Sequence, residues 1–249
     1  MSPVHLEIEA NVATITLDDP PTRNSLDVDT ATAMLRICQT IAADVTVGAA
    51  IVRGAGGTFC SGAARSLLRH AGEDPTESQR FDAVGIVYRS FVAVGELPVP
   101  TIAALRGAAV GAGVNLLLAT DLRIVADDAR IVTGFQKIGI HPGGGHFTLL
   151  SRLVGREVAA AMSLFGEEIS GAQAERLRLA WRSVPADDVD AVATELARQA
   201  ARDPELARRT VESFRAQAGP PAVSWAAGLA MERANQMWSL RRQRPAPSA

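Results

Sequence analysis

The sequence is poor in lysine, cysteine and aromatic residues. Its 249 residues include two cysteines and 4% aromatics, and Lys137 is the only lysine. Two cysteines, Cys38 and Cys60, are too few for a disulfide framework or a cysteine metal cluster. The net charge of -2 gives the whole molecule no general attraction to nucleic acid or anionic membranes. An anion site must therefore use arginine, backbone amides or helix N-termini.

Long hydrophobic runs are also missing. The longest, over residues 110–119, is interrupted by Gly111, Gly113 and Asn115 and is too short to span a bilayer. Residues 1–20 lack the basic start and apolar core of a secretory signal. We therefore expect a cytoplasmic chain with neither a membrane nor a nucleic-acid partner. Hydrophobic residues still make up 47% of the chain, which is typical of a folded globular protein.

Strand and helix patterns alternate over most of the chain. Alternating apolar residues predict a β-hairpin over residues 4–19, and short apolar runs predict buried strands. Ser170, with Gln173 at the capping-box position, predicts a helix start. The polar, proline-containing segment 70–79 is predicted to be a mobile loop. The further predicted strands are 49–52, 101–105, 122–126 and 130–133, and the predicted helices are 29–43, 77–94, 114–119, 146–154 and 170–177.

From residue 187 onward only helices are predicted, at about 187–202, 204–217 and 221–241, before a frayed polar tail. This order indicates an α/β core followed by a helical appendage. Apolar side chains recur at helical spacing in the last helix. They serve either core packing or contacts between subunits: Trp225, Leu229, Met231, Met237 and Trp238.

Two glycine-rich loops, at 54–63 and 107–113, each follow a predicted buried strand. Glycine lets backbone N–H groups approach a ligand, so two facing loops could form an oxyanion hole; alternatively the glycines only permit tight packing. A dinucleotide fingerprint is disfavoured because the third glycine is missing after Gly111 and Gly113. Ser61 lacks the flanking pattern of a hydrolase nucleophile. These absences argue against an NAD-linked oxidoreductase and against serine catalysis.

Four ordered segments resemble the crotonase, or enoyl-CoA hydratase/isomerase, superfamily. Residues 21–26 (PTRNSL) are similar to its P-x-R-N-[AS]-L segment, and residues 54–63 to its first glycine loop. Residues 107–113, followed by Asp121, resemble its second glycine loop. Residues 139–145 (GIHPGGG) resemble its G-x-x-P-G-x-G-G turn, and residues 169–184 resemble the segment after that turn. The match covers about residues 4–185.

The resemblance implies an α/β fold with a crotonase-type ββα spiral, in which residues 1–190 form an acyl-CoA-binding core. Residues 191–249 would form a C-terminal helical segment for assembly into a homotrimer or homohexamer. The thioester carbonyl would lie between the backbone N–H groups of Ala63 and Ala112. No separate cofactor is expected, because CoA is part of the substrate, and no metal is expected. The implied substrate-binding residues are Arg23, Ser61, Gly62, Arg65, Gly111, Asn115 and Phe135.

The chain departs from the family pattern where proton chemistry is expected. Hydratases of the resembled family place glutamates at the positions of Asn115 and Phe135, and usually an aspartate at Ala64. An amide and a phenyl ring cannot shuttle protons at neutral pH, so His141 in the adjacent turn is our candidate acid–base. His146 is interpreted as a buried neutral residue. We expect a lyase or isomerase of acyl-CoA, as in fatty-acid metabolism, or alternatively a non-catalytic acyl-CoA-binding protein.

Overall fold

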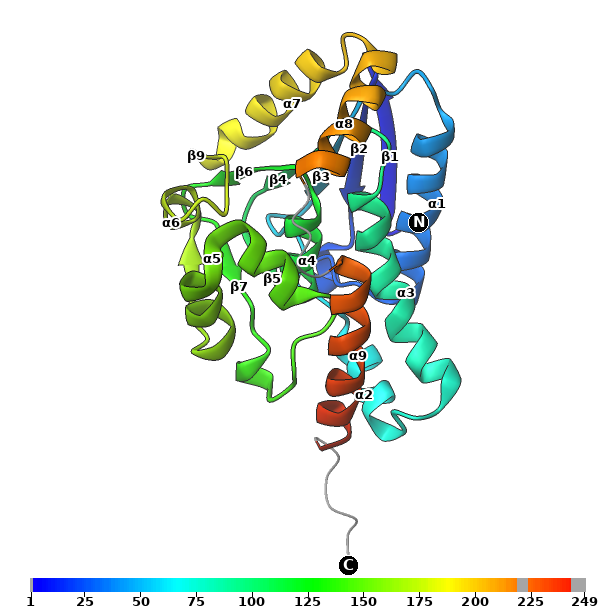
Figure 1. The fold of residues 1–249 in the computed structure, drawn as a ribbon, viewed down its shortest axis with the longest axis vertical. Coiled ribbons are helices and arrows are strands. Elements are labelled where there is room, and N and C mark those ends of the chain that lie inside the picture. Colours follow the sequence, from blue (N-terminus) through cyan, green and yellow to red (C-terminus); the bar gives the residue numbers. More distant parts are fainter. Residues whose placement is uncertain (1, 219–223, 243–249) are drawn as a thin grey trace, which may run out of the picture.

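The computed structural model describes residues 2–218 and 224–242 (Figure 1). The strands are β1 (Val4–Glu9), β2 (Val12–Leu17), β3 (Ala49–Gly54), β4 (Thr101–Leu105), β5 (Ala108–Val110), β6 (Leu122–Ala126), β7 (Arg130–Val132), β8 (Ile169–Ser170) and β9 (Arg182–Val184). The helices are α1 (Val28–Ala43), α2 (Arg65–Glu73), α3 (Ser78–Gly95), α4 (Ala112–Ala119), α5 (His146–Leu164), α6 (Gly171–Arg176), α7 (Val189–Ala200), α8 (Pro204–Ala218) and α9 (Trp225–Arg242). Short 3-10 helices lie at Pro20–Thr22, Gln136–Ile138 and Ala186–Asp188.

The larger sheet has the strand order β1-β2-β3-β4-β6-β9. β1 and β2 form the antiparallel hairpin predicted from the alternating pattern, and each remaining pair of neighbours is parallel. Parallel neighbours have their carboxyl ends at the same edge of a sheet. The segments that follow β3 and β4 therefore leave the sheet side by side, and these segments contain the two glycine-rich loops.

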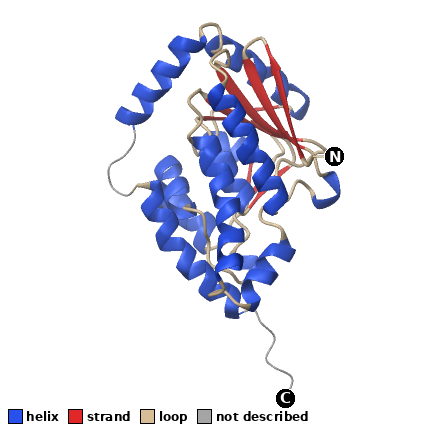
Figure 2. Ribbon diagram, turned by 90° about the vertical axis from the view of Figure 1, so that its right-hand side faces the viewer, coloured by secondary structure: helices blue, strands red, loops and turns tan. Residues whose placement is uncertain are grey.

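The smaller sheet, with the order β5-β7-β8, continues from that edge. β5 and β7 are parallel, while β7 and β8 are antiparallel. A single parallel bridge between Cys60 and Ala109 joins the first glycine loop to β5. Figure 2 shows the strands gathered in one half of the molecule, with helices filling the other half. The mixed α/β architecture predicted from the sequence is confirmed.

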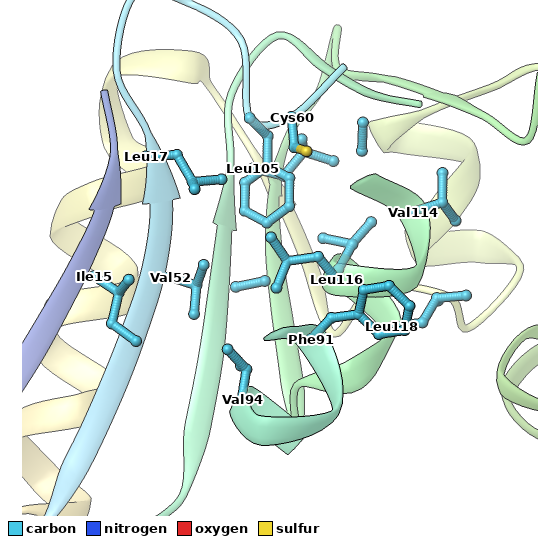
Figure 3. Packing of buried hydrophobic residues seen from close by; sticks show 14 of the residues in the cluster. Ile15, Leu17, Val52, Cys60, Phe91, Val94, Leu105, Val114, Leu116 and Leu118 are labelled. Carbon is cyan, nitrogen blue, oxygen red and sulfur yellow. The ribbon is translucent and has the colours of Figure 1, made fainter. Parts of the chain in front are cut away.

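The apolar core lies between the larger sheet and α3 and α4. Leu17, Val52 and Leu105 project from three strands of the larger sheet toward Leu116 of α4 and Phe91 of α3 (Figure 3). Phe91, Leu105 and Leu116 are fully buried. Burying a side chain of this size contributes about 1.5–3 kcal/mol relative to leaving it exposed. This packing fixes α4, and hence the glycine loop at its start, against the sheet.

The C-terminal helices pack directly on the core. α7 lies against β3, β4 and β6, and α9 lies against α2 and α5. Arg215 of α8 pairs with Asp121, whose carboxylate also accepts the Thr101 backbone N–H. The boundary proposed after residue 190 falls inside α7. Among the described residues, no helix is both long and apolar enough to cross a membrane.

Several elements differ from the sequence predictions. Residues 70–73 belong to α2 rather than to a loop, because α2 packs against α9. The helix predicted to end at residue 154 continues to Leu164 across a non-helical Gly155. The short strands β5, β8 and β9 carried no clear period and were not predicted. The side chains of Met231 and Trp238, and residues 243–249 of the tail, lie outside the described part of the chain.

Candidate functional site

The first glycine loop is fixed by a short parallel pairing with residues 23–26. The Leu26 N–H donates to the Gly62 carbonyl at 2.8 Å, and the Ala64 N–H donates to the Leu26 carbonyl at 2.9 Å. Successive N–H groups of an extended segment point in opposite directions. The Ala63 N–H therefore points away from this pairing and forms no hydrogen bond within the described residues.

The second glycine loop ends at the first turn of α4. Gly111, at φ +54°, precedes the helix, and Ala112 is its first residue. The first N–H groups of a helix have no acceptor within that helix. The Ala112 N–H accordingly has no hydrogen-bond partner within residues 2–218 and 224–242. Two loops thus each present an uncommitted backbone donor.

The two loops are in van der Waals contact, which explains the glycines at positions 62 and 113. Gly62 has φ +92°, and a Cβ there would lie 2.5 Å from the Val110 carbonyl oxygen and 3.3 Å from the Ala112 nitrogen. A Cβ on Gly113 would overlap the Cys60 carbonyl. Side chains at either position would push the loops apart. Close packing of the two loops therefore accounts for the glycines at positions 62 and 113.

A cavity of about 120 Å³ opens beside these loops. It brings together seven of the residues singled out from the sequence: Ser61, Gly62, Ala63, Arg65, Gly111, Ala112 and Phe135. The rest of the wall is mainly apolar and comes from α2, α3 and the segment after β7, as Leu67, Leu68, Val84, Val87, Ile138 and Ile140. The sequence motifs therefore converge on one concave site.

Three other predicted residues do not line the cavity. Arg23 lies behind the first loop, where its carbonyl accepts the Ser61 N–H at 3.0 Å. His141 is half-buried, its Nδ1 lies 2.7 Å from the Pro142 carbonyl oxygen, and its ring packs edge-on against Phe147. Asn115 is buried beneath the cavity wall.

Asn115 forms the centre of a buried polar network. Its Nδ2 donates to the Gly143 carbonyl at 2.8 Å, and its Oδ1 lies 2.8 Å from His146 Nδ1. Because an amide oxygen only accepts, Nδ1 of a neutral His146 must carry the proton. His146 Nε2 then accepts from the Ser163 hydroxyl at 3.2 Å. Gly143 lines the cavity, so this network holds part of the cavity wall.

Burial keeps His146 neutral. Desolvation lowers the pKa of this fully buried imidazole from 6.5 to about 3. Phe135 lies edge-on to the His146 ring, with ring centroids 5.0 Å apart, and its other side faces the cavity. The interpretation of His146 as a buried neutral residue is confirmed, although it bonds to Asn115 and Ser163 as well as packing.

Charge is nearly absent from the cavity. Among the described residues that line it, none carries a carboxylate or an imidazole, and Arg65 is the only charged one. Glu168 lies elsewhere and is paired with Arg130, whose hydrogen bonds lower the pKa of the Glu168 carboxyl. Cys60 is buried, and desolvation raises the pKa of its thiol to about 12, so it is unreactive.

Other lining residues are not among the site residues expected from the sequence; those with a polar side chain are Tyr88, Thr133 and Gln236. Val84 and Tyr88 lie within the predicted helix 77–94, and their apolar side chains at helical spacing indicate a buried face without showing that it faces the cavity. Gln236 lies more than a hundred residues from the glycine loops. Gln236 carried no sequence signal.

The fold and the paired loops define a crotonase-type α/β protein. The family model for enoyl-CoA hydratase/isomerase matches residues 7–237, and the chain belongs to that family. The chain is similar to probable enoyl-CoA hydratase EchA14 of Mycobacterium tuberculosis, with 41% identity covering 89% of this chain and 84% of that protein. It is 32% identical to 1,2-epoxyphenylacetyl-CoA isomerase of Escherichia coli, over 79% of this chain and 75% of that protein.

Solved structures agree with this assignment. An enoyl-CoA hydratase/isomerase from Xanthobacter autotrophicus Py2 matches with a TM-score of 0.87 and 27% identity, over 97% of this chain and 90% of that one. An enoyl-CoA hydratase from Bacillus halodurans also matches with a TM-score of 0.87, over 96% of each chain. Its 23% identity makes it similar in fold alone.

Proposed function

We propose that this protein binds acyl-CoA thioesters and polarises the thioester carbonyl with the N–H groups of Ala63 and Ala112. The observation that carries this proposal is the pair of facing loops with uncommitted backbone donors at one apolar cavity. A thioester enolate concentrates negative charge on its oxygen, and preorganised dipoles stabilise that charge most strongly where water is excluded. The position of Ala112 at a helix N-terminus adds to the stabilisation.

The CoA portion would lie along the first loop. Backbone groups of Ser61, Ala63 and Arg65 would bind the adenine end. Arg65 is exposed at the cavity, and Arg23 is exposed next to Ser61; in this proposal their guanidinium groups would bind the CoA phosphates outside the cavity. These guanidinium groups would supply the positive charge of the phosphate site, which the single lysine of the chain does not supply.

The proton chemistry of this site differs from that of a two-glutamate hydratase in our proposal. Asn115 is committed to Gly143 and His146, and Phe135 presents a hydrocarbon face to the cavity. Neither side chain can orient water or exchange a proton near neutral pH. His141 remains our candidate acid–base; to act, its ring would have to turn toward the cavity from its contact with Phe147.

A second candidate function is non-catalytic binding of acyl-CoA. The observation that favours it is the lack of a carboxylate or imidazole among the described cavity-lining residues. The two functions differ in the effect of His141→Ala. This substitution abolishes turnover in the catalytic protein and leaves thioester affinity near normal in both cases.

The proposal is tested by calorimetric binding of a CoA thioester, combined with mass-spectrometric turnover of trans-2-enoyl-CoA. Ala112→Pro removes one N–H at a helix position that tolerates proline, whereas Ala112→Ser retains it. We expect Ala112→Pro to lower turnover by about 10²–10³-fold, or thioester affinity alone if the protein only binds. The serine variant should resemble the parent. Equal behaviour of all three proteins would overturn the oxyanion assignment.

A further inference from the structure

The cavity is small for a site that would hold the acyl half of a thioester. Its volume is about 120 Å³. An enclosed apolar cavity of about 150 Å³ holds a benzene ring, which sets the scale. On that scale the cavity of this chain accepts an acyl group of about four to six carbons. A longer chain would require the walls to move.

The walls that set this volume are well packed. Val84 and Val87 of α3, one turn apart, face the cavity and are buried, and Tyr88 beside them is also buried. Phe135 closes a further side and is backed by His146. Close-packed walls resist displacement, because moving them opens voids or strains side chains.

One side of the cavity has no space behind it. Gly143 lines the cavity, and even a methyl group on its Cα would overlap the Tyr88 hydroxyl and the Gln236 amide. Asn115 holds the Gly143 carbonyl from below at 2.8 Å. The turn at Gly143 is therefore fixed between α3, α4 and α9, and an acyl chain cannot extend through it.

The chemistry of the lining restricts the acyl group further. Arg65 is the only charged side chain among the described lining residues, and it is exposed to solvent. A carboxylate at the far end of an acyl group would be buried without a cationic partner. That burial is strongly unfavourable unless the carboxylate is paired and hydrogen-bonded.

We propose that the substrate class is CoA thioesters of short, uncharged acyl groups, no larger than about a six-membered ring. This inference rests on the proposed function, since it names the substrate of the same site. Long-chain acyl groups are excluded by the α3 and Phe135 walls, and dicarboxylic acyl groups are excluded by the lack of a buried cation.

The test is isothermal titration of the full chain with free CoA, butyryl-CoA, decanoyl-CoA and succinyl-CoA. Butyryl-CoA should bind more tightly than free CoA. It should also bind at least about tenfold more tightly than decanoyl-CoA or succinyl-CoA, a difference of about 1.4 kcal/mol. Decanoyl-CoA binding as tightly as butyryl-CoA overturns the size limit, and equal binding of succinyl-CoA overturns the charge limit. Failure of all four ligands to bind overturns the proposed function itself.

A matched pair of variants tests the role of the α3 wall. Val84→Ala with Val87→Ala enlarges the cavity, whereas Val92→Ala truncates the same residue type on the same helix away from it. The enlarged variant should narrow the affinity gap between butyryl-CoA and decanoyl-CoA by about fivefold, and Val92→Ala should leave it unchanged. An unchanged gap in a folded enlarged variant contradicts the assignment of this wall. The ligand series on the parent chain stands independently of whether the variants fold.

Discussion

Two groups of polar side chains stabilise different parts of this protein, one through hydrogen bonds between neutral groups and the other through an ion pair. Beneath the cavity, Asn115, His146 and Ser163 are buried and neutral, and are linked by hydrogen bonds. At the amino ends of β4 and β6, Arg215 and Asp121 form a bidentate ion pair with N–O distances of 3.1 and 2.6 Å. About a quarter of each of these two side chains remains exposed.

The difference shows where this fold tolerates charge. A partly exposed ion pair keeps much of its hydration, so its formation requires little desolvation. A fully buried charge would lose that hydration, and the chain places an amide, an imidazole and a hydroxyl there instead. The cavity wall is consequently fixed by neutral dipoles. An enolate oxygen at Ala63 and Ala112 would then meet backbone donors with no competing side-chain charge nearby.

The largest effect is expected from removing the centre of the neutral network. Asn115→Leu leaves the Gly143 carbonyl and the His146 Nδ1–H buried without a partner. Each orphaned group costs about 1–3 kcal/mol, so we expect a loss of about 4 kcal/mol in the free energy of unfolding. Chemical denaturation with a circular-dichroism readout measures it.

A double-mutant cycle provides the control for this prediction. His146→Phe in the Asn115→Leu background removes the orphaned imidazole donor, so the double variant should lose less stability than the sum of the single variants. Strict additivity would show that Asn115 and His146 do not act as a unit.

A smaller loss of stability is expected from breaking the Arg215–Asp121 ion pair. Arg215→Met removes the ion pair and the hydrogen bond to the Leu97 carbonyl, but Asp121 keeps the Thr101 donors and access to water. We expect a loss of about 2 kcal/mol, reduced in 1 M salt, with Arg215→Lys recovering only part of it because an ammonium cannot form the fork. Arg209→Met, which breaks the exposed pair with Glu205, should cost less than about 0.5 kcal/mol. Equal losses of stability in Arg215→Met and Arg209→Met would show that the partly buried ion pair is no more stabilising than the exposed one.

The sequence predicted the elements whose signals are local. Apolar and polar residues alternate over most of the hairpin at residues 4–17, and both halves of the Ser170–Gln173 capping box form as expected. The two glycine loops also came together, because consecutive parallel strands deliver the segments that follow them to one edge. Local chemistry and sheet topology were sufficient for these features.

The sequence predictions were wrong or incomplete where contacts between distant segments determine the structure. Residues 70–73 look like a polar loop until α9 supplies a surface for α2, with Leu240 packed against Gly72. His141 was placed at the site by its motif, but the contact of its ring with Phe147 is not encoded in that motif. Gln236 joins the cavity through the packing of α9, which no local pattern specifies.

The effect of pH on the stability of the unsubstituted protein gives a further test of the buried neutral network around His146. The pKa of His146 is lowered to about 3 in the folded protein, against 6.5 for an ordinary histidine. Above pH 6.5 the His146 imidazole is neutral in both the folded and the unfolded protein, so it does not change the free energy of unfolding. As the pH falls from 6.5 toward 3, the imidazole is protonated in the unfolded protein but stays neutral in the folded protein. The free energy of unfolding therefore declines by about 2 kcal/mol by pH 5.

Urea denaturation at pH 7 and pH 5 measures this decline. His146→Gln should reduce it by that amount, whereas His5→Gln, at an exposed histidine, should not. A decline of the same size in His146→Gln would mean that the neutral network does not depend on an uncharged imidazole.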